Sequence, residues 1–304
     1  MVLNRFMITP TSLQKGDTVA IVSTARKISK EELQPAIHLL ESWGLKAVLG
    51  KTIGAEENQF AGNDDLRAAD FQQMMDDPKI KAIWCARGGY GTVRIVDKLN
   101  FSAFKKHPKW IIGYSDVTVL HSHIHNFGIE TLHAQMCLEI ENKTKEARES
   151  IRKVLFGEDY KIEFQQKKLQ TSQGIISGEL IGGNLSVLYS LIGSASAMKS
   201  DGKILFIEDL DEMLYHVDRM MMNLKRSGYL KNLKALIIGG MTQMKDNKVY
   251  FGKTAEETIM DLVKEYNYPV IFNFPAGHIV DNRALIMGRK VKVNVQSSIV
   301  NVQF

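Results

Sequence analysis

Residues 18–49 read TVAIVSTARKISKEELQPAIHLLESWGLKAVL, and the order of apolar and polar residues in this stretch decides the fold class. Residues 18–23 form a short apolar run of the kind found in buried strands. Helical spacing then relates Ala36, Ile37, Leu40 and Trp43. This spacing predicts a helix that begins at Ser29 and is closed by Gly44, a residue favoured at helix C-termini. Residues 47–49 complete the segment as a second strand.

The same alternation continues outward from this stretch. The pattern predicts a helix with an acidic first turn over residues 64–75, and strands at residues 80–86 and 110–113. Strands that alternate with helices of this length indicate βαβ units and a parallel sheet. Ligands of such sheets bind beyond the carboxyl ends of the strands. Two segments lie at such ends, residues 87–91 (RGGYG) and residues 113–116 (GYSD).

The second half of the chain predicts a further unit. A chain of 304 residues has room for about two domains, and its composition turns polar near residue 142. We therefore expect an N-terminal α/β domain over residues 1–150, a linker over residues 151–173 and a C-terminal domain over residues 174–304. The pattern in the latter predicts strands at 203–207 and 235–238, helices at 212–225 and 254–266, and antiparallel strands within 284–304.

Composition and charge exclude several classes of protein. Hydrophobic residues make up 44% and charged residues 24%, which is ordinary for a globular protein. The net charge of +5 is spread over short basic pairs such as Lys105-Lys106, so we expect no nucleic-acid partner. Two cysteines form no disulfide framework and favour a reducing compartment. We see no signal peptide and no apolar run near the roughly 18 residues of a membrane span. The expectation is a soluble, cytoplasmic protein without a membrane partner.

Motifs for nucleotide cofactors and metals are incomplete. Gly89-x-Gly91 lacks the third glycine of a dinucleotide fingerprint, because position 94 is Arg94. The Gly252-Lys-Thr tripeptide lacks the first glycine of a phosphate-binding loop. In His121-Ser-His-Ile-His125 only the first and last histidines share a helix face, and no acidic partner stands at a ligand spacing. We expect neither a cofactor nor a metal; the histidines fit a partly exposed helix.

The segment Gly113-Tyr-Ser115-Asp116 carries a different signal. A predicted strand runs into it and a predicted helix leaves it, so the serine hydroxyl is exposed beside the free amides of a helix N-terminus. That geometry suits an acyl nucleophile, although a serine that only caps the helix has the same pattern. A base and an orienting acid are also needed. His278, in a glycine-flanked loop, and Glu208, at a strand end, are candidates. Asp209, Asp211 and Glu212 compete for the acid's role.

Several motifs together resemble one enzyme family, and they occur in the family's order. They are Ala86-Arg-Gly-Gly-Tyr-Gly91, Gly113-Tyr-Ser-Asp116, Gly182-Gly-Asn-Leu185, Ile207-Glu-Asp209 with Asp218-Arg219, and Gly277-His278. From about residue 15 to residue 295 the chain resembles the LD-carboxypeptidases of serine peptidase family S66, whose relatives include the microcin C immunity peptidases. Two departures occur: Gly240-Met-Thr242 replaces a more usual Phe-Thr pair, and Phe274-Pro-Ala precedes the Gly-His pair.

The resemblance implies a role for each matched residue. Ser115 would be the nucleophile, His278 the general base and acid, and Glu208 the group that orients His278. The oxyanion hole would be the amide of Asp116 and one amide from Gly88 or Gly89. Arg87 is a candidate for the substrate carboxylate on charge alone, with a structural ion pair as the alternative.

The resemblance also implies an architecture and an activity. It implies a flavodoxin-like N-terminal domain with a parallel sheet, a smaller β-rich α/β C-terminal domain, a site assembled between them, and a homodimer. The implied reaction is hydrolysis of the bond between the L-centre of a diamino acid and terminal D-Ala in murein tetrapeptide, during peptidoglycan recycling. The third peptide residue, meso-diaminopimelate or L-Lys, stays open. The alternatives are a microcin C immunity-type peptidase that cleaves peptidyl-adenylate analogues and a non-catalytic peptide-binding protein.

Overall fold

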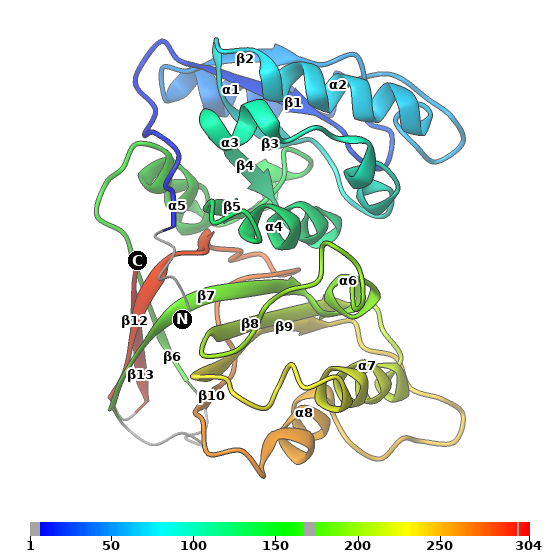
Figure 1. The fold of residues 1–304 in the computed structure, drawn as a ribbon, viewed down its shortest axis with the longest axis vertical. Helices are drawn as coiled ribbons and strands as arrows, with labels where there is room; N and C mark the ends of the chain where they lie inside the picture. The colour runs from blue at the N-terminus through cyan, green and yellow to red at the C-terminus, as the bar shows by residue number, and fades with distance from the viewer. Residues whose placement is uncertain (1–6, 167–173, 297) are drawn as a thin grey trace.

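Two β-sheets, one above the other along the long axis, organise the molecule (Figure 1). The computed structural model describes residues 7–166, 174–296 and 298–304. The first sheet has the strand order β11-β5-β4-β3-β1-β2, and the second has the order β10-β9-β8-β7-β12-β13-β6. The α/β fold class is confirmed, and the order β2-β1-β3-β4-β5 is that of flavodoxin-like folds.

Five parallel strands and one antiparallel strand form the first sheet. Its strands are β1 (Thr18–Val22), β2 (Lys46–Leu49), β3 (Ile80–Cys85), β4 (Trp110–Gly113), β5 (Thr131–His133) and the antiparallel β11 (Leu285–Met287). Its helices are α1 (Gln34–Ser42), α2 (Asp64–Asp76), α3 (Ser102–Lys106), α4 (Thr118–His125) and α5 (Lys145–Leu155). Helices α1 and α5 pack on one face and α2, α3 and α4 on the other, so the central strands are buried on both sides.

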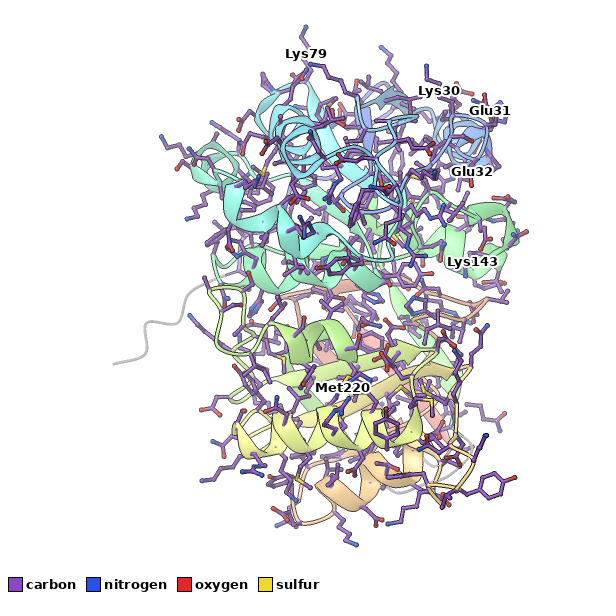
Figure 2. The ribbon with its side chains drawn as sticks, turned by 90° about the vertical axis from the view of Figure 1, so that its right-hand side faces the viewer. Lys30, Glu31, Glu32, Lys79, Lys143 and Met220 are labelled. Carbon is purple, nitrogen blue, oxygen red and sulfur yellow. The ribbon has the colours of Figure 1, made fainter. Side chains whose placement is uncertain are left out.

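The second sheet is half parallel and half antiparallel. Its strands are β6 (Lys161–Gln165), β7 (Gly174–Asn184), β8 (Ile204–Leu210), β9 (Ala235–Thr242), β10 (Val270–Ile271), β12 (Lys290–Gln296) and β13 (Ile299–Gln303). Its helices are α6 (Leu185–Ser190), α7 (Leu214–Arg226) and α8 (Ala255–Val263). These helices cover one face of the parallel strands, and Met220 of α7 lies buried between α7 and the sheet (Figure 2).

The helix predicted from Ser29 begins five residues later, at Gln34, and this prediction was wrong at its start. Pro35 is the reason: it has no amide to donate within a helix, and it is tolerated only in the first turn. Ser29 and Glu32 instead close a separate turn, in which each side chain accepts from the other's backbone amide. In this turn Lys30, Glu31 and Glu32 are exposed at the surface (Figure 2).

The sheets exchange segments across the expected domain division. The range 151–173, expected as a linker, contains the end of α5 and the edge strand β6, while residues 167–173 lie outside the described part of the chain. Strand β11, from the second half, pairs with β5 of the first sheet. Local composition does not reveal either pairing, because the partner strands are more than a hundred residues away. In the ranges described, no helix has the length and apolar character needed to cross a membrane.

Candidate active site

Ser115 stands on a sharp turn at the carboxyl end of β4. Tyr114 is still extended, but Ser115 has φ +59°, a conformation that non-glycine residues rarely adopt. A short 3₁₀ turn, η3 (Ser115–Val117), then leads into α4. The turn is tight, since a Cβ on Gly113 would lie 2.8 Å from a methyl group of Val117. The strand-to-helix turn predicted from the sequence is therefore present, with the serine at its strained position.

His278 reaches Ser115 from the loop between β10 and β11. Its Nε2 lies 3.1 Å from Ser115 Oγ. The loop is held by Asn282, a fully buried side chain whose Oδ1 accepts from the amide of Gly277 at 2.8 Å. Thr242 Oγ1 donates to the carbonyl of His278 at 3.1 Å. These two hydrogen bonds hold the backbone just before and just after the His278 side chain.

Glu208, in β8, is fully buried beneath the histidine. Its Oε2 lies 2.6 Å from His278 Nδ1 and also accepts from the His278 backbone amide at 3.0 Å. A carboxylate at Nδ1 places the ring proton there, so Nε2 faces Ser115 as an acceptor. Burial alone would lower the pKa of His278, but the charge and hydrogen bond of Glu208 outweigh it and raise that pKa.

The three competing acids have other partners. Asp209, also buried, accepts from Asn184 Nδ2 and from the amide of Ser186, each at 2.9 Å. Burial, together with the neighbouring charge of Glu208, raises the pKa of Asp209 to about 7. Asp211 pairs with Lys245, and Glu212 pairs with His216. Of the four acids considered, only Glu208 forms a hydrogen bond with His278.

A glycine-rich loop after β3 faces the serine. Asp116 ties it to the turn, because Asp116 Oδ2 accepts from the amide of Thr92 at 2.9 Å and from its hydroxyl at 2.6 Å. No hydrogen bond among the described residues engages the amides of Gly88 and Gly89. These amides are therefore available to a ligand beside Ser115.

The serine, histidine and glycine loop line one cleft of about 390 Å³, whose walls come from both sheets. Arg87 is in its wall and donates from Nη1 to the carbonyl of Lys27 at 3.1 Å. Arg87 forms no ion pair within the described ranges. No carboxylate there supports the alternative that Arg87 belongs to a structural ion pair.

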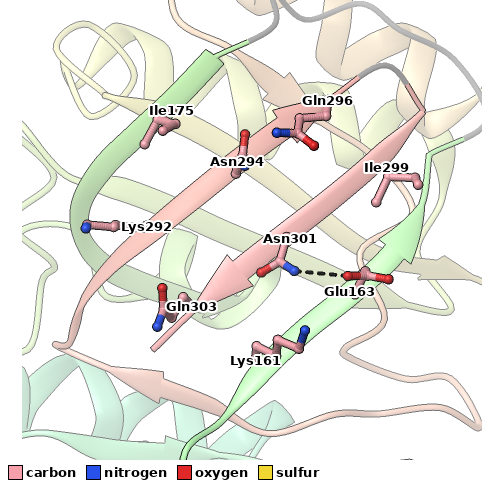
Figure 3. A pocket seen from close by; sticks show the side chains of 9 residues that line it. All are labelled: Lys161, Glu163, Ile175, Lys292, Asn294, Gln296, Ile299, Asn301 and Gln303. Carbon is pink, nitrogen blue, oxygen red and sulfur yellow. Dashed lines mark hydrogen bonds between the residues drawn. The ribbon is translucent and has the colours of Figure 1, made fainter.

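A second hollow, of about 450 Å³, lies on the face of β6, β7, β12 and β13 (Figure 3). Its polar side chains include Lys161, Glu163, Lys292, Asn294 and Asn301, and Asn301 Nδ2 donates to Glu163 Oε2 at 3.1 Å. None of its lining residues is a serine, cysteine or histidine. This hollow therefore has no serine or cysteine nucleophile beside a histidine base.

The histidines of α4 each have a structural partner. His121 is fully buried between the carbonyl of Gly113 at 2.8 Å and the hydroxyl of Thr131 at 2.7 Å. His123 Nδ1 lies 2.8 Å from Ser196 Oγ, and His125 pairs with Glu179. The helix is buried against the second unit rather than partly exposed, which corrects that expectation. In the described part of the chain, no three potential ligand side chains form a metal-binding group.

Two residues that position the site carry no sequence signal. Asn282 and Thr92 belong to none of the motifs above, yet one holds the histidine loop and the other holds Asp116. Asn184 was visible only as part of the Gly-Gly-Asn motif. Its Nδ2 lies 3.4 Å from Glu208 Oε1 and its amide donates to Thr118 Oγ1 at 3.0 Å, so it connects the acid's strand to the serine's helix.

A serine, a histidine and a buried carboxylate in this chain of contacts form the arrangement of a serine hydrolase. Comparison with known proteins identifies the family. Residues 19–134 match the LD-carboxypeptidase N-terminal domain and residues 177–293 match the LD-carboxypeptidase C-terminal domain. A probable murein peptide carboxypeptidase of Bacillus subtilis (strain 168) is 34% identical over 296 residues, covering 94% of this chain and 91% of the relative. The chain belongs to the LD-carboxypeptidase family, peptidase family S66, and is therefore a peptide-bond hydrolase.

Solved structures agree with this assignment. The muramoyltetrapeptide carboxypeptidase of Oxalobacter formigenes superposes with a TM-score of 0.86 at 26% identity, covering 94% of this chain and 98% of that one. The microcin C7 self-immunity protein MccF, in complex with aspartyl sulfamoyl adenosine, has a TM-score of 0.86 at 22% identity over 98% of both chains. The second likeness establishes the shared fold.

Proposed function

We propose that the protein is a serine LD-carboxypeptidase that removes terminal D-Ala from murein tetrapeptide. The contact chain from Ser115 Oγ through His278 to Glu208 carries this proposal, because each step is at hydrogen-bond distance. The names of its relatives supply the substrate class: one is a probable murein peptide carboxypeptidase and another a muramoyltetrapeptide carboxypeptidase. Peptidoglycan recycling would use this reaction.

In the proposed mechanism Ser115 Oγ attacks the carbonyl at the L-centre of the diamino acid. His278 Nε2 takes the hydroxyl proton while Glu208 stabilises the imidazolium. The amide of Asp116 and an amide of Gly88 or Gly89 hold the oxyanion, and loss of one such donor typically costs about 3 kcal/mol of transition-state stabilisation. His278 then protonates the D-Ala nitrogen as the bond breaks. Water, activated by the same histidine, hydrolyses the acyl-enzyme and restores Ser115.

Three further properties are part of the proposal. Arg87 would bind a substrate carboxylate, and its place in the cleft, without an ion pair to any described residue, supports this. A cytoplasmic location is supported by Cys85 and Cys137, both buried as free thiols. Homodimer formation is inferred from the family resemblance.

The test is D-Ala release from murein tetrapeptide, followed by mass spectrometry, for the wild type and Ser115→Ala. We expect release by the wild type only, with an unchanged circular dichroism spectrum for the variant. Ser102→Ala is the matched control, since Ser102 is an exposed serine outside the cleft. Normal turnover by Ser115→Ala would refute the assignment of the nucleophile.

The same protein samples separate the alternative functions. Cleavage of an aminoacyl sulfamoyl adenosine, without release of D-Ala, would favour an immunity-type peptidase, whose fold the chain shares. Peptide binding without any product from either substrate would favour a non-catalytic role.

A further inference from the structure

Arg26 and Arg87 line the cleft, and neither has a carboxylate partner in the described part of the chain. Arg87 donates only to the carbonyl of Lys27, and no side-chain hydrogen bond or ion pair of Arg26 occurs among the residues described. Other arginines near this region are paired: Arg67 and Arg94 both contact Asp64. Unpaired guanidinium groups that face a ligand cleft are available for an anionic ligand.

Arg26 is fixed at its backbone and lies against the glycine loop. Its carbonyl accepts from Ser23 Oγ at 2.6 Å, and its backbone forms a bridge with Phe60. Its side chain crosses Gly89, where a Cβ would lie 2.5 Å from Arg26 Nε. Gly89 has φ +107°, so this position is suited to glycine both by conformation and by the passage of Arg26. The guanidinium group therefore lies next to Gly89, one of the two glycines whose amides are proposed for the oxyanion.

Three acidic residues that line the cleft come from the second unit. They are Asp209, Asp211 and Glu212, all at or just after the end of β8. Each of these acids already has a partner, whereas a substrate carboxylate near the glycine loop meets Arg26 and Arg87, which have no carboxylate partner among the described residues. The cleft thus orients a peptide that has a negative end.

We propose that Arg26, with Arg87, binds the free carboxylate of the residue that is released, and so limits the enzyme to the last residue of a peptide. This inference rests on the proposed carboxypeptidase function. In the released residue the carboxylate is separated from the scissile nitrogen by one carbon, so it must lie close to the group that binds the oxyanion. A guanidinium group binds a carboxylate through two parallel hydrogen bonds, and an amide in place of the carboxylate cannot accept both.

The test compares two substrates with the same variants. The substrates are murein tetrapeptide and its C-terminal amide, in which D-Ala carries a carboxamide. We expect wild-type kcat/KM to be about 100-fold higher for the free acid. Arg26→Gln should lower kcat/KM for the acid by about 10- to 100-fold and leave the amide nearly unchanged, while Arg26→Lys should retain part of the preference for the acid. Arg94→Gln, an exposed arginine outside the cleft, should keep the wild-type preference.

The outcomes distinguish this inference from the function on which it rests. A wild type that releases D-Ala, together with Arg26→Gln that keeps the full preference for the acid, would overturn the inference alone. An equal loss on both substrates would also overturn it, because that result indicates a structural role for Arg26. A wild type that cleaves neither substrate would overturn the proposed function and this inference with it.

Discussion

The carboxylate of Glu208 holds both the ring and the backbone of His278, and it does so without exposure to solvent. Such a buried charge is tolerated because its oxygens accept several hydrogen bonds. Its effect on His278 is electrostatic as well as geometric. The neighbouring Asp209 acts in the same direction on the pKa of His278, and Lys143 acts in the opposite direction.

Glu208→Gln should lower kcat by about 10³- to 10⁴-fold and shift the pH profile. The proposed mechanism needs neutral His278, and the raised pKa of this residue should move the acid limb of kcat/KM to higher pH than an ordinary histidine would give. Removal of the Glu208 charge lowers that pKa, so the acid limb should move to lower pH. Profiles of D-Ala release against pH would measure it, with Glu212→Gln as a control that leaves the limb in place. An unmoved limb in Glu208→Gln would contradict the pairing.

Gly277→Ala should abolish most activity, because its Cβ would lie 2.7 Å from Glu208 Oε2 and its φ is +105°. We expect at least about 100-fold lower kcat and a loss of about 1–3 kcal/mol in unfolding free energy. Gly252→Ala is the matched control: φ is +87° there, but a Cβ would meet open space. Turnover and thermal unfolding of both variants would separate backbone strain from the clash. Equal activity in the two would disprove the role of the close approach.

The contacts of helix α4 could not be predicted from the sequence of the helix itself. The sequence predicted a partly exposed helix for its three histidines, but their partners Thr131, Ser196 and Glu179 come from other segments, which the sequence of the helix does not reveal. His121 Nε2 donates to the Gly113 carbonyl, and its Nδ1 accepts from Thr131, which fixes the neutral ring. The helix therefore supports the turn of Ser115 from behind.

His121→Gln should change how stability depends on pH. Burial lowers the pKa of His121 to about 4, below its ordinary 6.5. Its contribution to stability is fully present above pH 6.5 and is lost as pH falls towards 4, because the unfolded state then binds the proton more strongly. The difference in unfolding free energy between wild type and variant should shrink by about 3 kcal/mol across this window. Denaturant titrations at pH 7 and pH 4 measure it, and a constant difference would contradict the prediction.

Predictions from the sequence were most accurate where a structural feature depends on residues that are close together in the chain. The apolar strands of the first sheet and the turn at Ser115 were predicted because their residues are contiguous. The matched motifs also identified Ser115, Glu208 and His278, which the fold brings together. The start of α1 was missed because a single proline overrode a helical pattern. Asn282 and the pairing of β11 depend on contacts between distant residues, which a single sequence does not reveal.

At the scale of the whole molecule, the site belongs to neither sheet alone. Ser115 follows a strand of the first sheet, and Glu208 lies in the second. The amide of Asn184 and the hydroxyl of Thr118 join the two units directly behind the site. Relative movement of the sheets would change the distance between Ser115 and His278, so the packing between the sheets is part of the geometry that the proposed mechanism requires.

A chain that ends at residue 150 should be inactive and prone to self-association. It lacks Glu208 and His278, and it leaves β5 without its partner β11, which exposes a strand edge. Size-exclusion chromatography and D-Ala release, compared with the full chain, test this prediction. A monomeric fragment with native-like stability would instead support a boundary at residue 150 between independent domains.

The pairing of β5 with β11 also has a consequence for biosynthesis. His133 can pair with Leu285 only after the ribosome has added about 150 further residues, so the edge strand of the first sheet forms late. The half that carries the serine is thus begun first, but its sheet is completed only near the end of synthesis. The residues proposed for catalysis are made in the order Ser115, Glu208 and His278, and the final strand of the first sheet follows shortly after His278. A premature stop codon beyond residue 174 but before residue 285 would therefore release a chain with an open sheet edge and no activity.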